Sequence, residues 1–439
     1  MNPHGPAPTS EFLPPGRISS QSLNARSLRP KELDTRTIEA WAELAQRSAD
    51  CNPFLSPDFV LPALTHLTPA ADARIVLVET TDADPRLLAL GVFEQVPPSR
   101  FFPLPHLRAY RSPHSFLTGV LLDAESGGIA LDVLLAHLKA GASGTTAVHW
   151  SHLASDSALC KALRASSAWH EHDTSKRAFL VPPDCGEAFL AQHLSATRQK
   201  NLRRRKRHLE QIAPLHWRIR RGAQVDEQCI DTFLRLEDTG WRNAHGCSLR
   251  TMAGHEAFFR AMATSFALDG RIFFAELVLG DKVIASSSNL LQGNAAFAFK
   301  LGWDAAYANM APGMLNEVEL VKQLPEQFPG FAYLDSCATP GSFLEELYRG
   351  RREIVSGCYA LSGISGLLLR WLEWARRLKR AAMRRHSHSG TTALTSTRDS
   401  HPQGIVAVKA APTPDDAVEK SHHRAARHLP CTQLRLHFQ

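Results

Sequence analysis

The chain has 439 residues and a mass of 48.5 kDa, with 44% hydrophobic and 21% charged residues. At about 150 residues per domain this length allows two or three domains, and the composition excludes a wholly disordered, collagen-like or coiled-coil protein. No run approaches the roughly 18 to 20 apolar residues of a transmembrane helix, and the N-terminus lacks the apolar core of a secretory signal. We therefore expect a cytoplasmic protein.

Positive charge is concentrated in two segments of the sequence. Residues 198–210 carry seven Lys or Arg against Glu210, and residues 364–385 carry seven against Glu373, so each segment has a charge of +6. The whole chain has a net charge of +7, which leaves 7 − 12 = −5 for the remainder. Each basic segment could meet the phosphates of a cofactor, a nucleic acid or an anionic lipid.

Cysteine and histidine give no metal-binding motif. The eight cysteines are scattered singly without a Cys-x-x-Cys pair, which is typical of reduced, buried side chains. Seven of the 21 histidines lie in 386–439 at irregular spacing, among Ser, Thr and Pro. We expect a solvated, disordered tail there and no metal cofactor.

The first part of the chain divides into a polar arm and a folded half. Residues 1–35 are rich in Pro and Ser without periodicity, which predicts a disordered arm. The N-terminal half, 36–185, combines apolar runs of strand length with amphipathic helical patterns. We expect helices near 38–49, 130–141 and 155–166, a hairpin over 73–80 and 86–95, and strands at 145–150 and 177–181.

The second half, 186–360, repeats much of this order. It begins with a basic helix over about 187–212, in which Leu202, Leu209 and Ile212 share one face. Gly-Asp and Gly-Asn turns then join three strands, which predicts an antiparallel meander. The expected elements are strands at 217–222, 271–280, 281–293, 294–303 and 331–336, and helices at 229–241, 255–270 and from Pro312 to 324. The fold class is α/β (α+β), with two similar halves of mixed sheet.

The step from strand to helix at 302–321 is the most informative segment. Pro312 suits the first helical turn because it lacks an N–H that would have no partner there. Gly313 beside it permits close approach by a ligand. Free amides and the positive end of the helix dipole then form a site for a diphosphate, although an ordinary turn has the same pattern.

Three segments resemble one family. They are RQKNLRRRKRHLE at 198–210, LEDTGWRN at 236–243 and GWDAAYANMAPGML at 302–315. In this order they resemble the BioF-like acetyltransferase domain of the GNAT superfamily, which occurs in bacterial proteins linked to polysaccharide synthesis. The resemblance covers about 193–340, and the doubled layout is similar to that of FemAB-type proteins. It implies tandem GNAT-like domains, each a mixed twisted sheet flanked by helices.

The resemblance implies transfer of an acyl group from acyl-CoA, acetyl or longer, to an amine or hydroxyl. The thioester is expected between the strands at 294–302 and 331–336. The diphosphate is expected at Ala311, Pro312, Gly313, Met314 and Leu315. The family's aromatic-Ser-Pro-Gly sequence is replaced here by residues 309–313, Asn-Met-Ala-Pro-Gly, which removes a hydroxyl contact.

Direct attack on a thioester needs a base, an oxyanion donor and an acid for the departing thiolate. Asp335, at the end of the last strand, is the first candidate base and Glu237 the second. Tyr307 is the candidate acid. An Asp at a strand end can instead simply form a turn, and Glu237 can lie on a solvated helix face. Lys300 is expected to line the cleft, where it contacts phosphate or acceptor, or to be solvated.

Two basic elements suggest further contacts. Arg203 and Arg204 in the first are expected to meet the 3′-phosphate of CoA, an anionic glycan or tRNA. The second, 361–385, combines cations with an apolar stripe and fits an interfacial helix in peripheral contact with the inner membrane face. The same face could equally pack on the protein. The stripe consists of Ile364, Leu367, Leu368, Trp371, Leu372, Ala375 and Leu378.

The sequence therefore predicts a GNAT-type acyltransferase of polysaccharide or cell-envelope biosynthesis. Its partners are acyl-CoA and an acceptor bearing a sugar or an amine, and we expect no nucleic-acid partner because aromatic residues are sparse around the basic run. Two alternatives remain: a FemAB-like transferase that uses aminoacyl-tRNA, and a non-catalytic binding protein with a degenerate GNAT fold.

Overall fold

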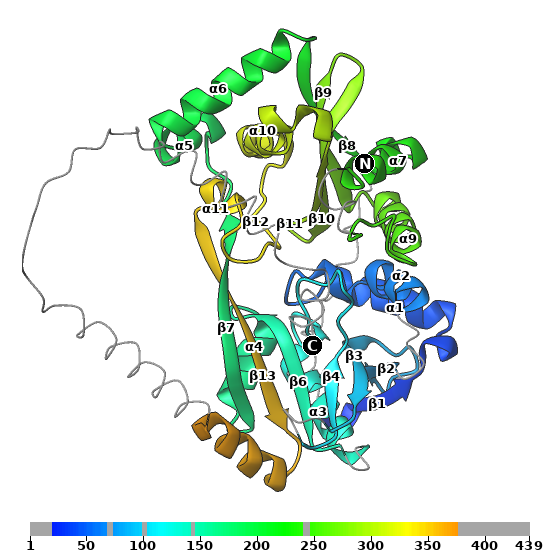
Figure 1. The fold of residues 1–439 in the computed structure, drawn as a ribbon. Coiled ribbons are helices and arrows are strands. Elements are labelled where there is room, and N and C mark those ends of the chain that lie inside the picture. Colours follow the sequence, from blue (N-terminus) through cyan, green and yellow to red (C-terminus); the bar gives the residue numbers. More distant parts are fainter. Residues whose placement is uncertain (1–19, 68–72, 99–102, 142–144, 240–245, 376–439) are drawn as a thin grey trace, which may run out of the picture.

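The computed structural model describes residues 20–67, 73–98, 103–141, 145–239 and 246–375 (Figure 1). These residues form a mixed α/β structure around one 13-stranded sheet. The strands are β1 (Leu23–Leu28), β2 (Ala73–Thr80), β3 (Leu87–Val96), β4 (His106–Ala109), β5 (Leu121–Leu122), β6 (Ala147–Ala154), β7 (Trp169–Leu180), β8 (Leu215–Arg221), β9 (Ile272–Leu279), β10 (Lys282–Gln292), β11 (Ala295–Trp303), β12 (Tyr333–Asp335) and β13 (Gly350–Ala360).

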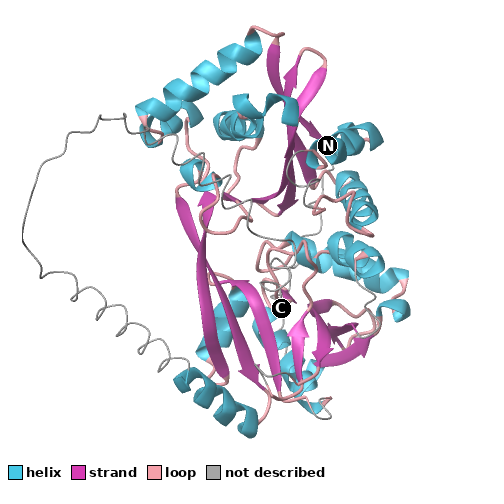
Figure 2. Cartoon of the chain, viewed as in Figure 1, coloured by secondary structure: helices cyan, strands magenta, loops and turns pink. Residues whose placement is uncertain are grey.

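Helices cover both faces of this sheet (Figure 2). The α-helices are α1 (Thr35–Gln46), α2 (Pro57–His66), α3 (Gly127–Ala140), α4 (Ala158–Ala165), α5 (Gly186–His193), α6 (Ala196–Glu210), α7 (Glu227–Glu237), α9 (His255–Leu268), α10 (Pro312–Gln327) and α11 (Leu344–Leu347). A further helix at 363–375 ends the described part of the chain. No helix within these described ranges is long and apolar enough to cross a membrane.

The strand order shows that the two halves have the same layout. The order is β1-β2-β3-β4-β6-β13-β7-β12-β11-β10-β9-β8, with β5 beside β3. Two pairings in this order are parallel, β4 with β6 and β11 with β12. Counted from the edge at β1, β4 and β6 are the fourth and fifth strands, and counted from the edge at β8, β11 and β12 are the fourth and fifth strands. The tandem architecture expected from the sequence is thereby confirmed.

The halves exchange their last long strands. β7 comes from the first half but pairs with β12 of the second, and β13 comes from the second half but pairs with β6 of the first. β7 and β13 also pair with each other and run along one side of the molecule, from the lower part to the upper part in Figure 1. The sheet is therefore continuous through both halves.

Two apolar cores lie on opposite faces of the second half. One contains the buried faces of α7 and α9 and continues into α1 and α2 of the first half, where Phe59 meets Phe258 at a ring distance of 5.3 Å. The other lies between the sheet and α5, α6 and α10. Because the first core includes residues of both halves, the halves are packed as one body.

Several elements differ from the sequence predictions. Leu23–Leu28, expected in a disordered arm, forms β1 because the edge of β2 offers it a partner over the whole strand. The basic helix expected over 187–212 is two helices, α5 and α6, since Ser195 caps a new helix by accepting from the N–H of Arg198. Ile212 lies beyond α6 and is 56% exposed. Residues 1–19 and the predicted tail at 386–439 lie outside the described residues.

Candidate functional site

The first turn of α10 begins with a left-handed residue. Ala311 has φ 48° and ψ 56°, and its carbonyl accepts the first helical hydrogen bond from Leu315 at 3.1 Å. Pro312 follows as the first helical residue, as the sequence predicted. No acceptor for the N–H groups of Gly313 and Met314 is found among the described residues. The positive end of this 16-residue helix therefore has two N–H groups without an acceptor in the described part of the chain.

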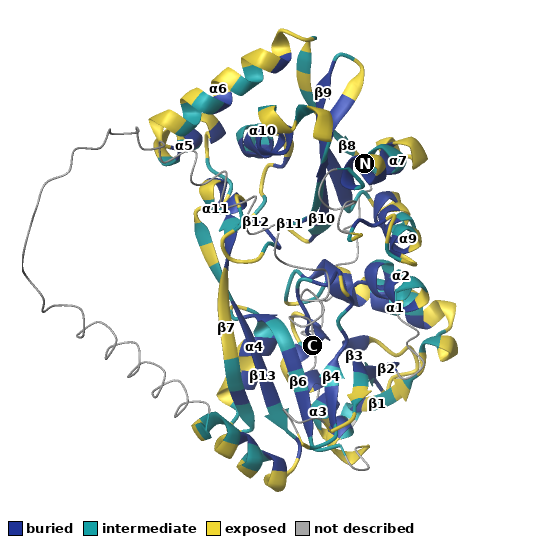
Figure 3. Cartoon of the chain, in the orientation of Figure 1, coloured by how far each residue is buried: buried dark blue, intermediate teal, exposed yellow. Residues whose placement is uncertain are grey.

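This turn is packed closely against the protein. Ala311 is half-buried, whereas Pro312, Gly313, Met314 and Leu315 are buried, as the dark colour of α10 in Figure 3 indicates. A side chain at Gly313 would approach Leu301 at 3.2 Å and Trp303 at 3.4 Å. Gly313 thus permits close packing of α10 on β11, whereas the sequence pattern predicted that it would permit close approach by a ligand.

The corresponding turn of the first half is already filled by a carboxylate. Helix α3 follows β5, and in the turn between them Asp123 accepts from the N–H groups of Glu125 at 3.2 Å and Ser126 at 3.0 Å. Arg47 and Arg86 pair with the same carboxylate at 3.0 and 2.8 Å. Although burial acts in the opposite direction, these contacts lower the pKa of Asp123. The turn that precedes α3 therefore already holds a carboxylate of the protein.

The two parallel strands of the second half separate after a short pairing. Residues 295–297 of β11 pair with 333–335 of β12, and the register ends there. Beyond that point the pairing of β11 with β10 is irregular. Ala298 pairs with Asn289 and Lys300 pairs with Ser288, whereas Phe299 between them has no register partner in β10. This parting of β11 and β12 is where the sequence analysis placed the thioester.

Asp335 lies at the base of this parting but is fully engaged. Its side chain is 0% exposed and pairs with Arg177 at 2.7 Å and Arg352 at 3.1 Å. It also accepts the N–H of Cys337 at 2.9 Å. These contacts engage both oxygens of the carboxylate, so the side chain is fully occupied within the protein. The structure thus places the first candidate base in an ion-pair network that joins β7, β12 and β13.

Glu237 is buried as well. A side chain at Gly302 would lie 2.5 Å from the N atom of Glu237, so the glycine lets the end of α7 contact β11. Glu237 is 1% exposed and accepts the N–H of Leu249 at 2.8 Å. The solvated helix face considered for Glu237 is therefore not what the structure shows.

A histidine pair, which the sequence analysis missed, joins the two halves near Lys300. Nε2 of His114, in the loop after β4, lies 2.8 Å from Nδ1 of His255, the first residue of α9. Burial lowers the pKa of both, and the positive charge of Lys300 lowers it further, while Glu237 opposes this effect at His255. Both imidazoles are therefore neutral at pH 7, and one nitrogen of the pair can accept a proton.

A second buried pair lies on the opposite face of the sheet. The hydroxyl of Tyr348 donates to Oε2 of Glu317 at 3.1 Å, and Glu317 is 3% exposed in the middle of α10. Burial raises the pKa of both groups, and the Glu317 charge raises that of Tyr348 further. Both side chains belong to the packing of α10.

The remaining candidates lie around the start of α10. Tyr307 is in the 3₁₀ turn η5 (Ala305–Met310), and Lys282 lies 5.5 Å from its ring centroid. This turn follows the far end of β11 from Asp335, so the structure does not bring the candidate acid and the first candidate base together. Helix α6 contacts η5, and its Arg203 and Arg204 are exposed.

The sequence predicted no metal, and this stays a prediction. Within the described ranges, one group of three side chains could supply metal ligands: His149, His172 and Cys358, whose ligand atoms lie within 4.8 Å of one another. They come from the neighbouring strands β6, β13 and β7, and burial lowers the pKa of His149 to about 3. None of the three residues is part of the α10 start or of the histidine pair.

Comparison with known proteins identifies the second half. Residues 195–342 match the family model described as acetyltransferase (GNAT) domain. This is the stretch in which three motifs resembled that superfamily, so the recognition is confirmed for about a third of the chain. The second half of this protein therefore contains a GNAT acetyltransferase domain. No curated protein sequence matches the chain.

Several solved structures show partial similarity over most of the chain. FemX is 11% identical and covers 79% of this chain and 100% of its own, with a TM-score of 0.48. A tandem GNAT protein from the clavulanic acid biosynthesis pathway is 14% identical over 77% of this chain and 99% of its own, with a TM-score of 0.39. A conserved protein of unknown function from Bacteroides thetaiotaomicron is 13% identical over 75% and 98%, with a TM-score of 0.43. At these values they say nothing about the substrate of this chain.

Proposed function

We propose that the second half transfers an acyl group from acyl-CoA to an amine or hydroxyl on a sugar-linked acceptor, in polysaccharide or cell-envelope biosynthesis on the cytoplasmic side. The observation that supports it most is the contrast between the two helix starts. The turn before α3 holds the buried carboxylate of Asp123, which accepts from the N–H groups of Glu125 and Ser126. For the N–H groups of Gly313 and Met314 at the start of α10, no acceptor is found in the described part of the chain. The first half would then shape the acceptor site.

The α10 start suits the diphosphate of the donor. Two amides at the positive end of a long helix favour an anion, and Ala311 beside them is half-buried. The exposed Arg203 and Arg204 of the neighbouring α6 could meet the remaining phosphate. The donor would supply an activated thioester, and the protein would have to orient the acceptor and take up its proton.

The histidine pair is our candidate for that proton transfer. His255 is neutral at pH 7 and can accept a proton, while His114 fixes the orientation of its ring through the shared hydrogen bond. Lys300, on the same face, would favour negative charge that develops nearby. Tyr307 stays our candidate for protonating the thiolate, because it lies in the turn that leads into α10. Asp335 and Glu237 would serve to position these elements.

Calorimetry with acetyl-CoA tests the donor site. Ala311→Asp would place a carboxylate at the N-cap of α10, next to the N–H groups of Gly313 and Met314, and Ala311→Asn is the uncharged control of nearly the same shape. Both residue types tolerate the left-handed backbone of Ala311. We expect the Asp variant to bind acetyl-CoA about tenfold or more weakly than the Asn variant, because the added charge repels the diphosphate.

Equal affinities of the two variants would contradict this donor site. Free-thiol release from acyl-CoA thioesters, with and without sugar nucleotides as acceptors, then measures transfer itself. If the wild-type protein instead bound charged tRNA in a salt-dependent way and did not bind acetyl-CoA, the aminoacyl-tRNA-dependent alternative would replace this proposal.

A further inference from the structure

The helix at 363–375 is attached to the first half by one face. Ser362 caps it by accepting from the N–H of Ser365 at 3.3 Å, and Ser365 is 0% exposed. Leu369, which is 4% exposed, packs with Ala147 of β6 and Cys358 of β13. The residues at positions 365 and 369 thus form the side of the helix that faces the sheet.

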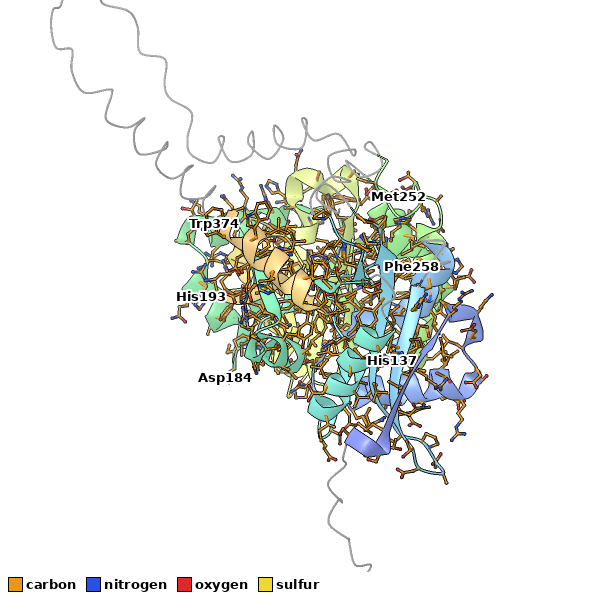
Figure 4. All side chains as sticks on the ribbon, turned by 90° about the horizontal axis from the view of Figure 1, so that it is seen from below. His137, Asp184, His193, Met252, Phe258 and Trp374 are labelled. Carbon is orange, nitrogen blue, oxygen red and sulfur yellow. The ribbon has the colours of Figure 1, made fainter. Side chains whose placement is uncertain are left out.

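The outer face of the same helix is an apolar stripe open to solvent. Ile364 is 76% exposed, Leu367 70%, Trp371 57% and Trp374 57%. At 100° per residue these four positions fall within about 80° of the helix circumference, so they form one continuous strip. Four of the nine exposed large apolar side chains in the described part of the chain are therefore gathered here. Figure 4 shows Trp374 near the edge of the molecule on this helix.

This arrangement decides between the two interpretations of the sequence stripe. Packing on the protein uses the side with Ser365 and Leu369, and it leaves the two tryptophans and their neighbours uncovered. Contiguous exposed apolar patches usually mark a site of interaction with another protein or with a membrane.

The charge around the stripe favours an anionic surface. Arg370 is exposed between the apolar positions, and the sequence that follows, 376–385, contains six Lys or Arg and no acidic residue. Exposed tryptophan together with cations close by in the chain is the combination that binds anionic lipid headgroups.

We infer that this stripe binds the surface of a bilayer that contains anionic lipid. Ile364, Leu367, Trp371 and Trp374 enter the boundary between headgroups and acyl chains, and the exposed Arg370 beside them meets the lipid phosphates. The positive charge of the sequence at 376–385 adds attraction to an anionic surface. The helix lies along the surface and does not span it. This surface is separate from α10, so the inference does not depend on the proposed acyl transfer.

Co-sedimentation of the full chain with lipid vesicles tests the inference. We expect binding to phosphatidylcholine vesicles with about 30 mol% phosphatidylglycerol to be about tenfold or more tighter than binding to pure phosphatidylcholine, since each cation near the surface adds attraction. Substituting both Trp371→Ser and Trp374→Ser should weaken it about tenfold. Leu268→Ser, which changes a side chain 83% exposed at the end of α9, is the matched control and should bind as the wild type does.

Other outcomes overturn the inference. Equal binding to neutral and anionic vesicles, or no binding, excludes the lipid surface. Unchanged binding by the double Trp variant, with circular dichroism showing it folded, means that the stripe takes no part. If sedimentation velocity without lipid shows a dimer that the double variant loses, the stripe is a contact between copies. The double variant should bind acetyl-CoA as the wild type does. A failure of the lipid inference can therefore be distinguished from a failure of the proposed acyl transfer.

Discussion

Arg177 and Asp335 form a buried ion pair across the boundary between the two halves, with Nε 2.7 Å from Oδ1 and Nη2 2.8 Å from Oδ2. Arg177 belongs to β7, the strand given by the first half, and Asp335 ends β12 in the second. Nη1 of Arg177 also donates to the carbonyl of Phe116 at 2.9 Å. This side chain therefore ties a loop of the first half to the point where β11 and β12 part.

Removing Arg177 should destabilise the whole protein. In Arg177→Met the buried Asp335 keeps only Arg352 as a charged partner, and we expect the free energy of unfolding to fall by about 3 kcal/mol, at the low end of the cost of breaking a buried pair. The control is Arg351→Met, which loses a partly exposed pair with Glu345 and should cost at most about 1 kcal/mol. Urea denaturation of both variants measures this, and equal losses would contradict a structural role for the buried pair.

The pH dependence of acyl transfer should report His255. Because burial and Lys300 lower its pKa below 6.5, the imidazole becomes protonated, and transfer slows, only on the acid side of that value. We expect a rate that is flat above pH 6.5 and falls below it. His255→Gln should lower kcat about 10²- to 10⁴-fold and remove the acid limb, without weakening acetyl-CoA binding. An acid limb that persists in this variant would assign the base elsewhere.

Glu317 should make the protein less stable as the pH rises. Burial raises its pKa in the folded state, so the folded protein retains a proton that the unfolded chain releases above about pH 4.5. Its contribution to stability is therefore complete below that pH and is lost as the pH increases. Glu317→Gln cannot ionise, so its free energy of unfolding relative to wild type should increase from pH 4.5 to pH 7.5. Urea denaturation across this range measures it, and parallel curves for the two proteins would be the contrary result.

Gly302 should not tolerate a side chain. A methyl group there would lie 2.5 Å from the N atom of Glu237 and 2.7 Å from the carbonyl carbon of Leu236, both of them backbone atoms of α7. We expect Gly302→Ala to lower the free energy of unfolding by about 1–3 kcal/mol through overpacking. Gly128→Ala is the control because no atom lies within 4 Å of the added methyl group and the site is in α3, where alanine is favoured. A loss of equal size in both variants would argue against the clash.

The sequence could predict those elements whose signals are local. The strand predicted at 73–80 is β2 with the same bounds, and the three strands of the second-half meander are β9, β10 and β11. Apolar runs of strand length, separated by Gly-Asp and Gly-Asn turns, are sufficient for this. The Pro312 helix start was predicted for the same reason, since the residues that define it are adjacent.

What the sequence could not predict depends on partners far apart along the chain. Asp335 is 158 residues from Arg177, so the end of a strand gave no sign that two arginines enclose the carboxylate. His114 and His255 are 141 residues apart and lie in no shared motif. β13 was not predicted because its length and placement are defined by pairing with β6 and β7, which belong to the other half.

The exchange of β7 and β13 also bears on how the chain folds as it is synthesised. The gap between β6 and β7 is filled by Gly350–Ala360, which the ribosome makes after nearly all the rest of the structured chain. Until those residues emerge, each of the two neighbouring strands has an unpaired edge that could join a strand of another nascent chain. The first half therefore cannot complete its part of the sheet until translation is nearly finished. A fragment that stops before residue 350 lacks the strand that joins β6 to β7, so its sheet is interrupted between these two strands.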